Sequence, residues 1–79
     1  MTYEEKQREI ALNRVKEYLE EQGIFEEDIK SINNLEDDYD YQGYPIYRFS
    51  IITYSDVDYS LEFYSVDGYI DFYDCLVIS

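Results

Sequence analysis

Histidine and tryptophan are absent from this 79-residue sequence, and cysteine occurs once, as Cys75. Without histidine, a metal centre lacks its commonest ligand, and a serine or cysteine nucleophile lacks its commonest base. Cys75 lies in an apolar stretch with no basic neighbour to activate its thiol and no second cysteine for an internal disulfide. We expect it to pack as a small hydrophobic residue. The expectation is therefore a non-enzymatic protein with no catalytic residue, no bound metal and no cofactor.

Long apolar runs are also missing. No stretch approaches the ~18 consecutive apolar residues that cross a bilayer, and the sequence does not open with a basic segment followed by an apolar one. We expect a protein that does not enter membranes and that works in a reducing cytoplasm.

Basic residues are scarce: six Lys and Arg stand against nineteen Asp and Glu, which gives a formal charge of −13. Residues 1–16 hold three acids and four bases, whereas residues 17–79 hold sixteen acids and two bases. This charge repels DNA and RNA, so direct nucleic-acid binding is not expected. It serves solubility alone, or it attracts a positively charged partner. Because 46% of the residues are apolar and 19% are aromatic, the chain should fold, as one domain over residues 1–79.

The first third of the sequence predicts a helix over residues 3–22. Thr2 and Glu5 have the spacing of a capping box, and apolar residues follow at intervals of three and four. Gly23 is expected to end the helix in a left-handed conformation. The next segment, residues 25–35, fits either a short helix or an irregular first strand, and both alternatives stay open.

From residue 44 onward the apolar residues alternate with polar ones, which predicts strands over 44–54, 59–66 and 69–78. Asp67-Gly68 is a strong signal for a two-residue hairpin turn between the last two strands. The predicted class is α+β, with the N-terminal helix packed on one face of a three- to four-stranded antiparallel sheet.

The hairpin turn also sets a register that divides the side chains between two faces of the sheet. Three opposite pairs are expected: Phe63 with Phe72, Tyr64 with Asp71, and Glu62 with Tyr73. The face under the helix should hold Phe49, Ile51, Leu61, Phe63, Ile70, Phe72 and Leu76. The outer face should hold Ile52, Tyr54, Glu62, Tyr64, Asp71 and Tyr73.

Several landmarks in this order resemble those of a PepSY-like domain. They are Ala11-Leu12, Gly23-Ile24, Ile29 and Ile32, Tyr47-Arg48-Phe49, Leu61-Glu62-Phe63, and Asp67-Gly68 before Tyr69-Ile70. The match covers roughly residues 10–73 and rests mostly on small and apolar positions. The resemblance implies a noncatalytic domain of a kind that is often exported and associated with peptidase inhibition. Strong acidity is not a hallmark of that family.

One segment is similar to the opening of a calcium-binding loop. Asp38, Asp40, Gln42 and Gly43 occupy loop positions one, three, five and six, but Phe49 stands where the bidentate glutamate should be. We interpret this segment as a solvated acidic turn and assign no metal to it.

The outer face combines tyrosines with carboxylates. Tyrosine is a favoured interface residue, and carboxylates two positions apart on a strand stand ~6.8 Å apart, a spacing of the same order as that of phosphates along a nucleic-acid strand. The sequence therefore favours an acidic DNA mimic, similar in type to phage-encoded anti-CRISPR and anti-restriction inhibitors. The predicted partner-binding residues are Asp37, Asp38, Asp40, Asp56, Asp58, Glu62, Asp71, Tyr54, Tyr64 and Tyr73.

The expected partner is a basic nucleic-acid-binding protein or nuclease complex, in the host cytoplasm if a phage encodes this chain. Monomer and homodimer both stay open. Two alternatives remain: a PepSY-like module that binds or inhibits a peptidase, and an immunity protein against a basic toxin.

Overall fold

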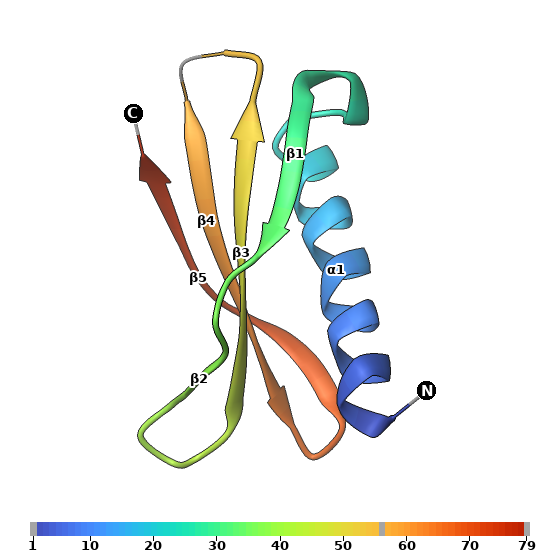
Figure 1. Cartoon of the computed structure of the whole chain (residues 1–79), viewed down its shortest axis with the longest axis vertical. Coiled ribbons are helices and arrows are strands. Elements are labelled where there is room, and N and C mark those ends of the chain that lie inside the picture. The colour runs from blue at the N-terminus through green and yellow to red at the C-terminus, as the bar shows by residue number, and fades with distance from the viewer. Residues whose placement is uncertain (1, 56, 79) are drawn as a thin grey trace.

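A computed structural model of the chain, which describes residues 2–55 and 57–78, has one helix packed against a five-stranded antiparallel sheet (Figure 1). The predicted α+β class is confirmed. The elements in order are α1 (Tyr3–Glu21), the 3-10 turn η1 (Glu26–Asp28), β1 (Ile29–Asn34), β2 (Asp38–Tyr39), β3 (Pro45–Thr53), β4 (Asp58–Val66) and β5 (Tyr69–Ile78). The strand order is β1-β3-β4-β5, and the two-residue β2 also pairs with β3. In the described residues, no helix is long and apolar enough to span a membrane.

Helix α1 begins and ends at the residues that carry capping signals. The Thr2 hydroxyl accepts a hydrogen bond from the Glu5 amide at 3.2 Å. At the other end, Gly23 has a φ of 81°, and the Ile24 amide donates back to the Leu19 carbonyl at 2.8 Å. This is the Schellman arrangement, which satisfies carbonyls that the helix end would otherwise leave free.

The segment between α1 and the sheet, which the sequence left open, is a 3-10 turn followed by a strand. The Asp28 carboxylate accepts a hydrogen bond from the Phe25 amide at 3.1 Å, which closes η1 at its start. Strand β1 then pairs antiparallel with β3, with a register shift between Ile29 and Ser31.

The β4–β5 hairpin confirms most of the predicted register. Phe63 lies opposite Phe72, and Tyr64 lies opposite Asp71. The third predicted pair is wrong, because a bulge at Tyr73 places Asp74 opposite Glu62. A bulge adds one residue to one strand, so every later side chain of that strand changes face.

That bulge also corrects the predicted face of Leu76. It lies opposite Ser60 on the outer face and is 61% exposed, while Cys75 lies opposite Leu61 and packs beside the core. The expectation that Leu76 helps form the core is therefore wrong.

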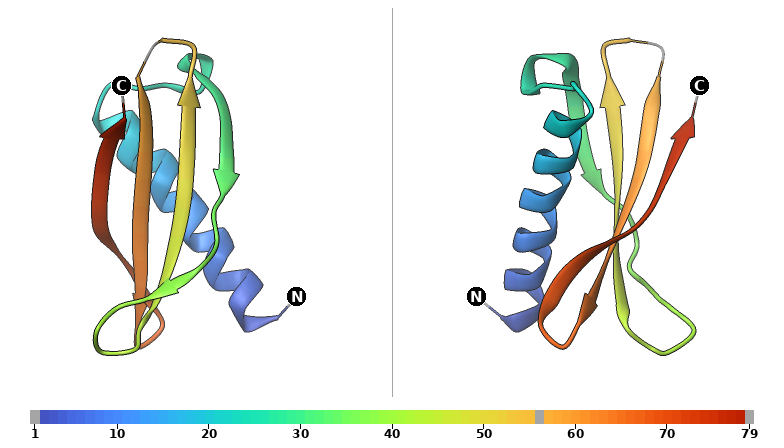
Figure 2. Two further views of the ribbon diagram at one scale, coloured as in Figure 1. Left: turned by 60° about the vertical axis from the view of Figure 1, so that its left-hand side comes forward. Right: turned by 180° about the vertical axis from the view of Figure 1, so that it is seen from behind.

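The core lies between α1 and the inner face of the sheet, which the helix crosses diagonally (Figure 2). Its buried members are Ala11, Val15, Leu19, Tyr47, Phe49, Ile51, Leu61, Phe63 and Ile70. Burying a large apolar side chain contributes ~1.5–3 kcal/mol, so these few residues provide most of the stabilisation. Phe72 extends the core to the sheet edge by stacking on Tyr18, with ring centroids 5.2 Å apart.

Candidate acidic interaction surface

The outer face of the sheet carries a row of charges across three strands. Arg48 on β3 lies opposite Glu62 on β4, with 3.9 Å between the guanidinium and the carboxylate. Glu62 in turn lies opposite Asp74 on β5. Glu62, a predicted partner-binding residue, is therefore partly neutralised within the protein, and Asp74, which the sequence analysis missed, is the exposed acid at the end of the row. We name these three residues the charge row.

Three other predicted residues lie together beside the charge row. The rings of Tyr64 and Tyr73 meet edge to face, with centroids 5.3 Å apart. The exposed Asp71 lies opposite Tyr64. This arrangement is a small aromatic surface with one free carboxylate, and it is the part of the predicted site that the structure brings together.

Asp37 lies elsewhere and already has a partner. Its carboxylate pairs with the guanidinium of Arg8 on α1, which also sits over the Tyr47 ring, 5.6 Å from the centroid. Burial raises the pKa of Tyr47, and the nearby Asp37 carboxylate raises it further, while Arg8 acts in the opposite direction. Asp37 therefore fastens the segment between β1 and β2 to the helix instead of forming part of the outer face.

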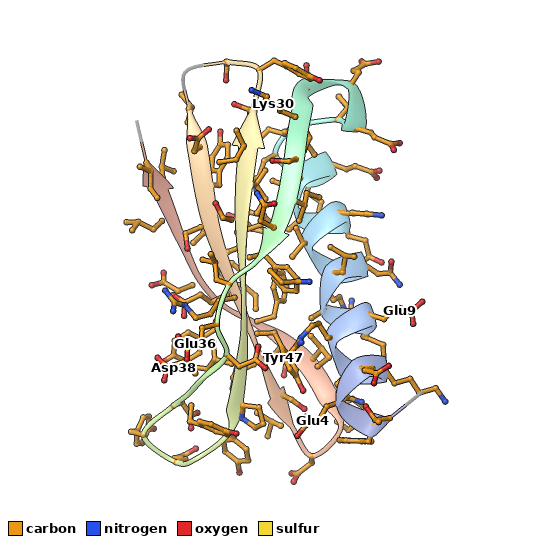
Figure 3. All side chains as sticks on the ribbon, in the orientation of Figure 1. Glu4, Glu9, Lys30, Glu36, Asp38 and Tyr47 are labelled. Atoms are coloured by element: carbon orange, nitrogen blue, oxygen red, sulfur yellow. The ribbon has the colours of Figure 1, made fainter. Side chains whose placement is uncertain are left out.

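Asp38 and Asp40 sit on either side of Tyr39 at the start of the β2–β3 hairpin, and only Asp38 is exposed. Glu36 and Asp38 project from this segment on the side away from α1 (Figure 3). One Asp40 oxygen accepts hydrogen bonds from the Gln42 and Tyr44 amides, at 2.9 and 2.8 Å. Asp40 thus closes the turn. Among the described residues, no three His, Cys, Asp or Glu side chains are placed so that together they could hold a metal ion.

The β3–β4 hairpin holds the remaining predicted residues. Tyr54 is 71% exposed, and the half-buried Asp58 accepts a hydrogen bond from the Thr53 amide at 3.3 Å. Asp56 lies outside the described residues. The hairpin is tied to η1, because the Tyr54 amide donates to the Asp28 carbonyl at 3.0 Å.

This hydrogen bond joins the hairpin to a cluster of acidic residues that are not among the predicted partner-binding residues. Residues 17–28 contain six acids and no base, and all six acids are exposed: Glu17, Glu20, Glu21, Glu26, Glu27 and Asp28. We name these six residues the acidic end. A shallow groove of about 240 Å³ lies between it and the β3–β4 hairpin, lined in part by Glu27, Asp28 and Tyr54. The signal was readable in the sequence as a block of like charge.

The acidic end opposes the preference of the helix that carries it. The C-terminal end of a helix has partial negative charge and favours cations, yet the last turn of α1 has no basic residue and contains Glu20 and Glu21. Each such acid costs ~0.3–1 kcal/mol at a surface position. Residues that destabilise their own helix without a compensating local contact are typically retained for function.

A separate groove of about 380 Å³ lies between α1 and β1. Apolar side chains, including Leu12, Ile24 and Ile32, form much of its lining, and Lys16 and Glu20 contribute charged groups. None of the predicted partner-binding residues lines it.

The ten predicted residues therefore do not form one surface. The structure divides the nine of them that it describes among the outer face, the segment between β1 and β2, the β2–β3 hairpin and the β3–β4 hairpin. Among these nine, Asp38, Asp71 and the tyrosines are the accessible members that have no ion pair with another described residue. No family model, no curated protein and no solved structure matches the chain.

Proposed function

We propose that this protein is an acidic DNA-mimic inhibitor that occupies the nucleic-acid-binding groove of a host defence protein, of the anti-CRISPR or anti-restriction type. The acidic end is the observation that carries the proposal. Its six carboxylates are exposed and uninterrupted by a base along the chain, and two of them, Glu20 and Glu21, lie in the last turn of α1 against its dipole. Glu17 pairs with Arg14 at 3.5 Å, one turn earlier on the helix. The six carboxylates contribute almost half of the net charge of −13.

The spacing of these carboxylates suits the imitation of a phosphate backbone. On a helix, residues three or four apart have Cβ atoms ~5–6 Å apart, which is the relation of Glu17 to Glu20 and Glu21. The 3-10 turn η1 then continues the negative charge beyond the helix through Glu26, Glu27 and Asp28. The series presents carboxylates to a row of Lys and Arg side chains at intervals comparable with those of a nucleic-acid strand.

Tyr54 supplies a complementary contact. It is 71% exposed and is held against η1 by its backbone bond to Asp28. Aromatic anchors contribute much of the free energy of protein–protein binding, while the charges mainly accelerate the encounter. The outer-face residues Asp71, Tyr64 and Tyr73 form a second, smaller surface of the same chemical character.

The test is competition between this protein and labelled duplex DNA for purified RNA-guided nucleases and restriction enzymes. Fluorescence anisotropy should show that the protein displaces DNA from its target. Glu20→Lys with Glu21→Lys, and separately Glu26→Lys with Glu27→Lys, should weaken displacement at least about tenfold, since like-charged contacts in a basic groove cost several kcal/mol. Glu62→Lys with Asp71→Lys tests the outer face in the same assay.

The matched control is Glu5→Lys with Glu9→Lys, which makes the same charge change at exposed positions in the first half of α1. It should change displacement less than about threefold through the general field. A target that binds this protein and its nucleic acid together, with neither weakening the other, would rule out mimicry. That outcome would favour a protein-binding module of the PepSY-like kind.

A further inference from the structure

Strand β5 forms a free edge of the sheet. It is ten residues long, and within the part of the chain that the structure describes it pairs only with β4. Alternate N–H and C=O groups of such a strand point away from the sheet and can pair with another strand. Proteins usually protect such edges with lysine, proline, inward charges or a bulge. In β5 the bulge and both acids lie before Cys75, so the segment Cys75–Ile78 has none of these protections.

The side chains of this unprotected segment are apolar and exposed. Leu76, Val77 and Ile78 are 61%, 57% and 50% exposed. Leu76 and Ile78 lie opposite Ser60 and Asp58 on the outer face, while Val77 lies opposite Tyr59 on the helix side. An added strand would therefore find apolar contacts on both faces of the sheet.

The charge row indicates which type of residue a partner strand should place beside β5. In the row Arg48–Glu62–Asp74, a cation is followed by two acids that lie directly opposite each other. Opposed like charges destabilise a sheet. One Asp74 oxygen accepts a hydrogen bond from the Cys75 amide at 2.8 Å, and no ion pair to Asp74 is present within residues 2–55 and 57–78. A Lys or Arg on a neighbouring strand would complete the row.

We infer that the β5 edge binds an extended segment of a basic protein as a sixth strand, with a Lys or Arg beside Asp74 and apolar residues beside Leu76 and Val77. The interaction is strand addition, in which main-chain hydrogen bonds give affinity and alternate side chains give selectivity. The C-terminal end of β5 lies at the same end of the molecule as the start of β1 (Figure 1), so the acidic end would attract such a partner toward this end of the sheet. The inference goes beyond the proposed function, since the segment need not belong to a nucleic-acid-binding protein.

A second copy of this chain is a poor occupant. Two copies would bring together two charges of −13. If two β5 strands paired antiparallel about Leu76, Asp74 of each would face Ile78 of the other, and neither row would gain a cation. Four or five residues per chain would also bury much less than ~1,200 Å², the lower limit for a standard interface.

The test is an NMR titration of the isotope-labelled protein with a synthetic nonapeptide that has a central lysine, three valines on each side of it and a threonine at each end. The amide signals of Asp74–Ile78 should shift in 0.5 M NaCl, where diffuse attraction is screened. The same peptide with alternate amides N-methylated should bind at least about tenfold more weakly, because the main-chain bonds are lost. Replacing its lysine with norleucine should weaken binding about twofold to fivefold.

Protein variants complete the test. Consecutive N–H groups of a strand point to opposite edges, so one of Leu76→Pro and Val77→Pro should keep the β4–β5 bonds and the melting temperature while abolishing peptide binding. Asp74→Asn should weaken binding of the lysine peptide by the same factor as the replacement of its lysine with norleucine. Leu76→Ser should weaken binding, whereas Ile10→Ser, at an exposed apolar position of α1, should not.

Three results would overturn the inference. They are equal binding of the N-methylated peptide, no shift of the β5 amides at millimolar peptide, and shifts confined to the groove between α1 and β1. Dimerisation of the free protein through protected β5 amides would replace the proposed partner with a second copy. The DNA competition assay is independent of all these measurements, so failure of the proposed function and failure of this inference can be distinguished.

Discussion

At the scale of single residues, the tip of the β4–β5 hairpin depends on two positive φ angles, 51° at Asp67 and 86° at Gly68. Gly68→Val should lower the free energy of unfolding by about 1–3 kcal/mol, because a β-branched residue is strained in this conformation. An added Cβ would meet only the Tyr3 hydroxyl at 3.7 Å, so the cost is in the backbone. Gly68→Asn should cost less, since asparagine tolerates positive φ. Urea unfolding measures both, and equal stability of Gly68→Val and the parent would contradict the turn.

Tyr47 links stability to alkaline pH. Burial, and then the Asp37 carboxylate, raise its pKa above the ordinary value in the folded protein. The unfolded chain should therefore lose this proton first, at about pH 10. The resulting stabilisation is complete below that pH and is lost as pH rises through the folded-state pKa. Tyr47→Phe should make the melting temperature fall less steeply above about pH 10. Tyr41→Phe, at a position that is 91% exposed, is the control and should keep the parent slope.

The free and engaged carboxylates could not be separated from the sequence. Asp37 pairs with Arg8, 29 positions away along the chain, and only the folded structure brings them together. Asp40 is engaged locally, and the hydrogen bonds of an Asp to amides two and four residues later were a readable turn signal. The bulge at Tyr73 had no signal, because Tyr73 and Asp74 both suit an exposed strand position. It accounts for the errors at Glu62 and Leu76.

At the scale of elements, α1 carries a charge distribution that is unfavourable at its C-terminal end. Glu20→Lys and Glu21→Lys should each raise the free energy of unfolding by about 0.3–1 kcal/mol, because cations suit the partial negative charge there. Urea unfolding at low salt measures the gain. Glu9→Lys is the matched control, since position 9 lies outside the last turn. Lower stability of both C-terminal variants would show that these acids have structural partners and would remove the argument that they are retained for function.

The elements that could be predicted are those with local signals. Thr2, Gly23 and Asp67-Gly68 set the ends of α1 and the β4–β5 turn through neighbouring backbone groups. Strands β1 and β2 have no comparable signal. Their residues become strand because β3 offers an edge, and β1 requires a register shift to follow it. Tertiary pairing decided these segments, as is usual for short or irregular strands.

At the scale of the whole molecule, the amino-acid composition indicated a strong negative electrostatic field but not which residues produce it. The charge of −13 predicted a basic partner, and the alternation of tyrosine with carboxylate directed attention to the sheet. In the structure, ion pairs and backbone hydrogen bonds engage Asp37, Asp40, Asp58 and Glu62. Among the acids of residues 17–28, Glu17 pairs with Arg14 and Asp28 accepts a hydrogen bond from the Phe25 amide, while the four glutamates at positions 20, 21, 26 and 27 are exposed. Glu62 on a strand has a cation on the adjacent strand that partly neutralises it, whereas Glu20, Glu21, Glu26 and Glu27 have no ion pair within the described residues. The helix end is therefore the stronger source of exposed negative charge.

The same field makes the stability of the whole protein depend on salt. Self-repulsion opposes the folded state, and at 0.15 M ionic strength it is screened beyond ~8 Å. Raising sodium chloride from 0.01 to 0.3 M should therefore raise the melting temperature. At matched ionic strength, calcium chloride and magnesium chloride should raise it by equal amounts. Asp40, the central acid of the loop similar to a calcium site, already uses one oxygen to bind two amides. A calcium-specific increase that grows with the logarithm of calcium concentration would contradict this expectation, because only a site selective for the folded state gives that dependence.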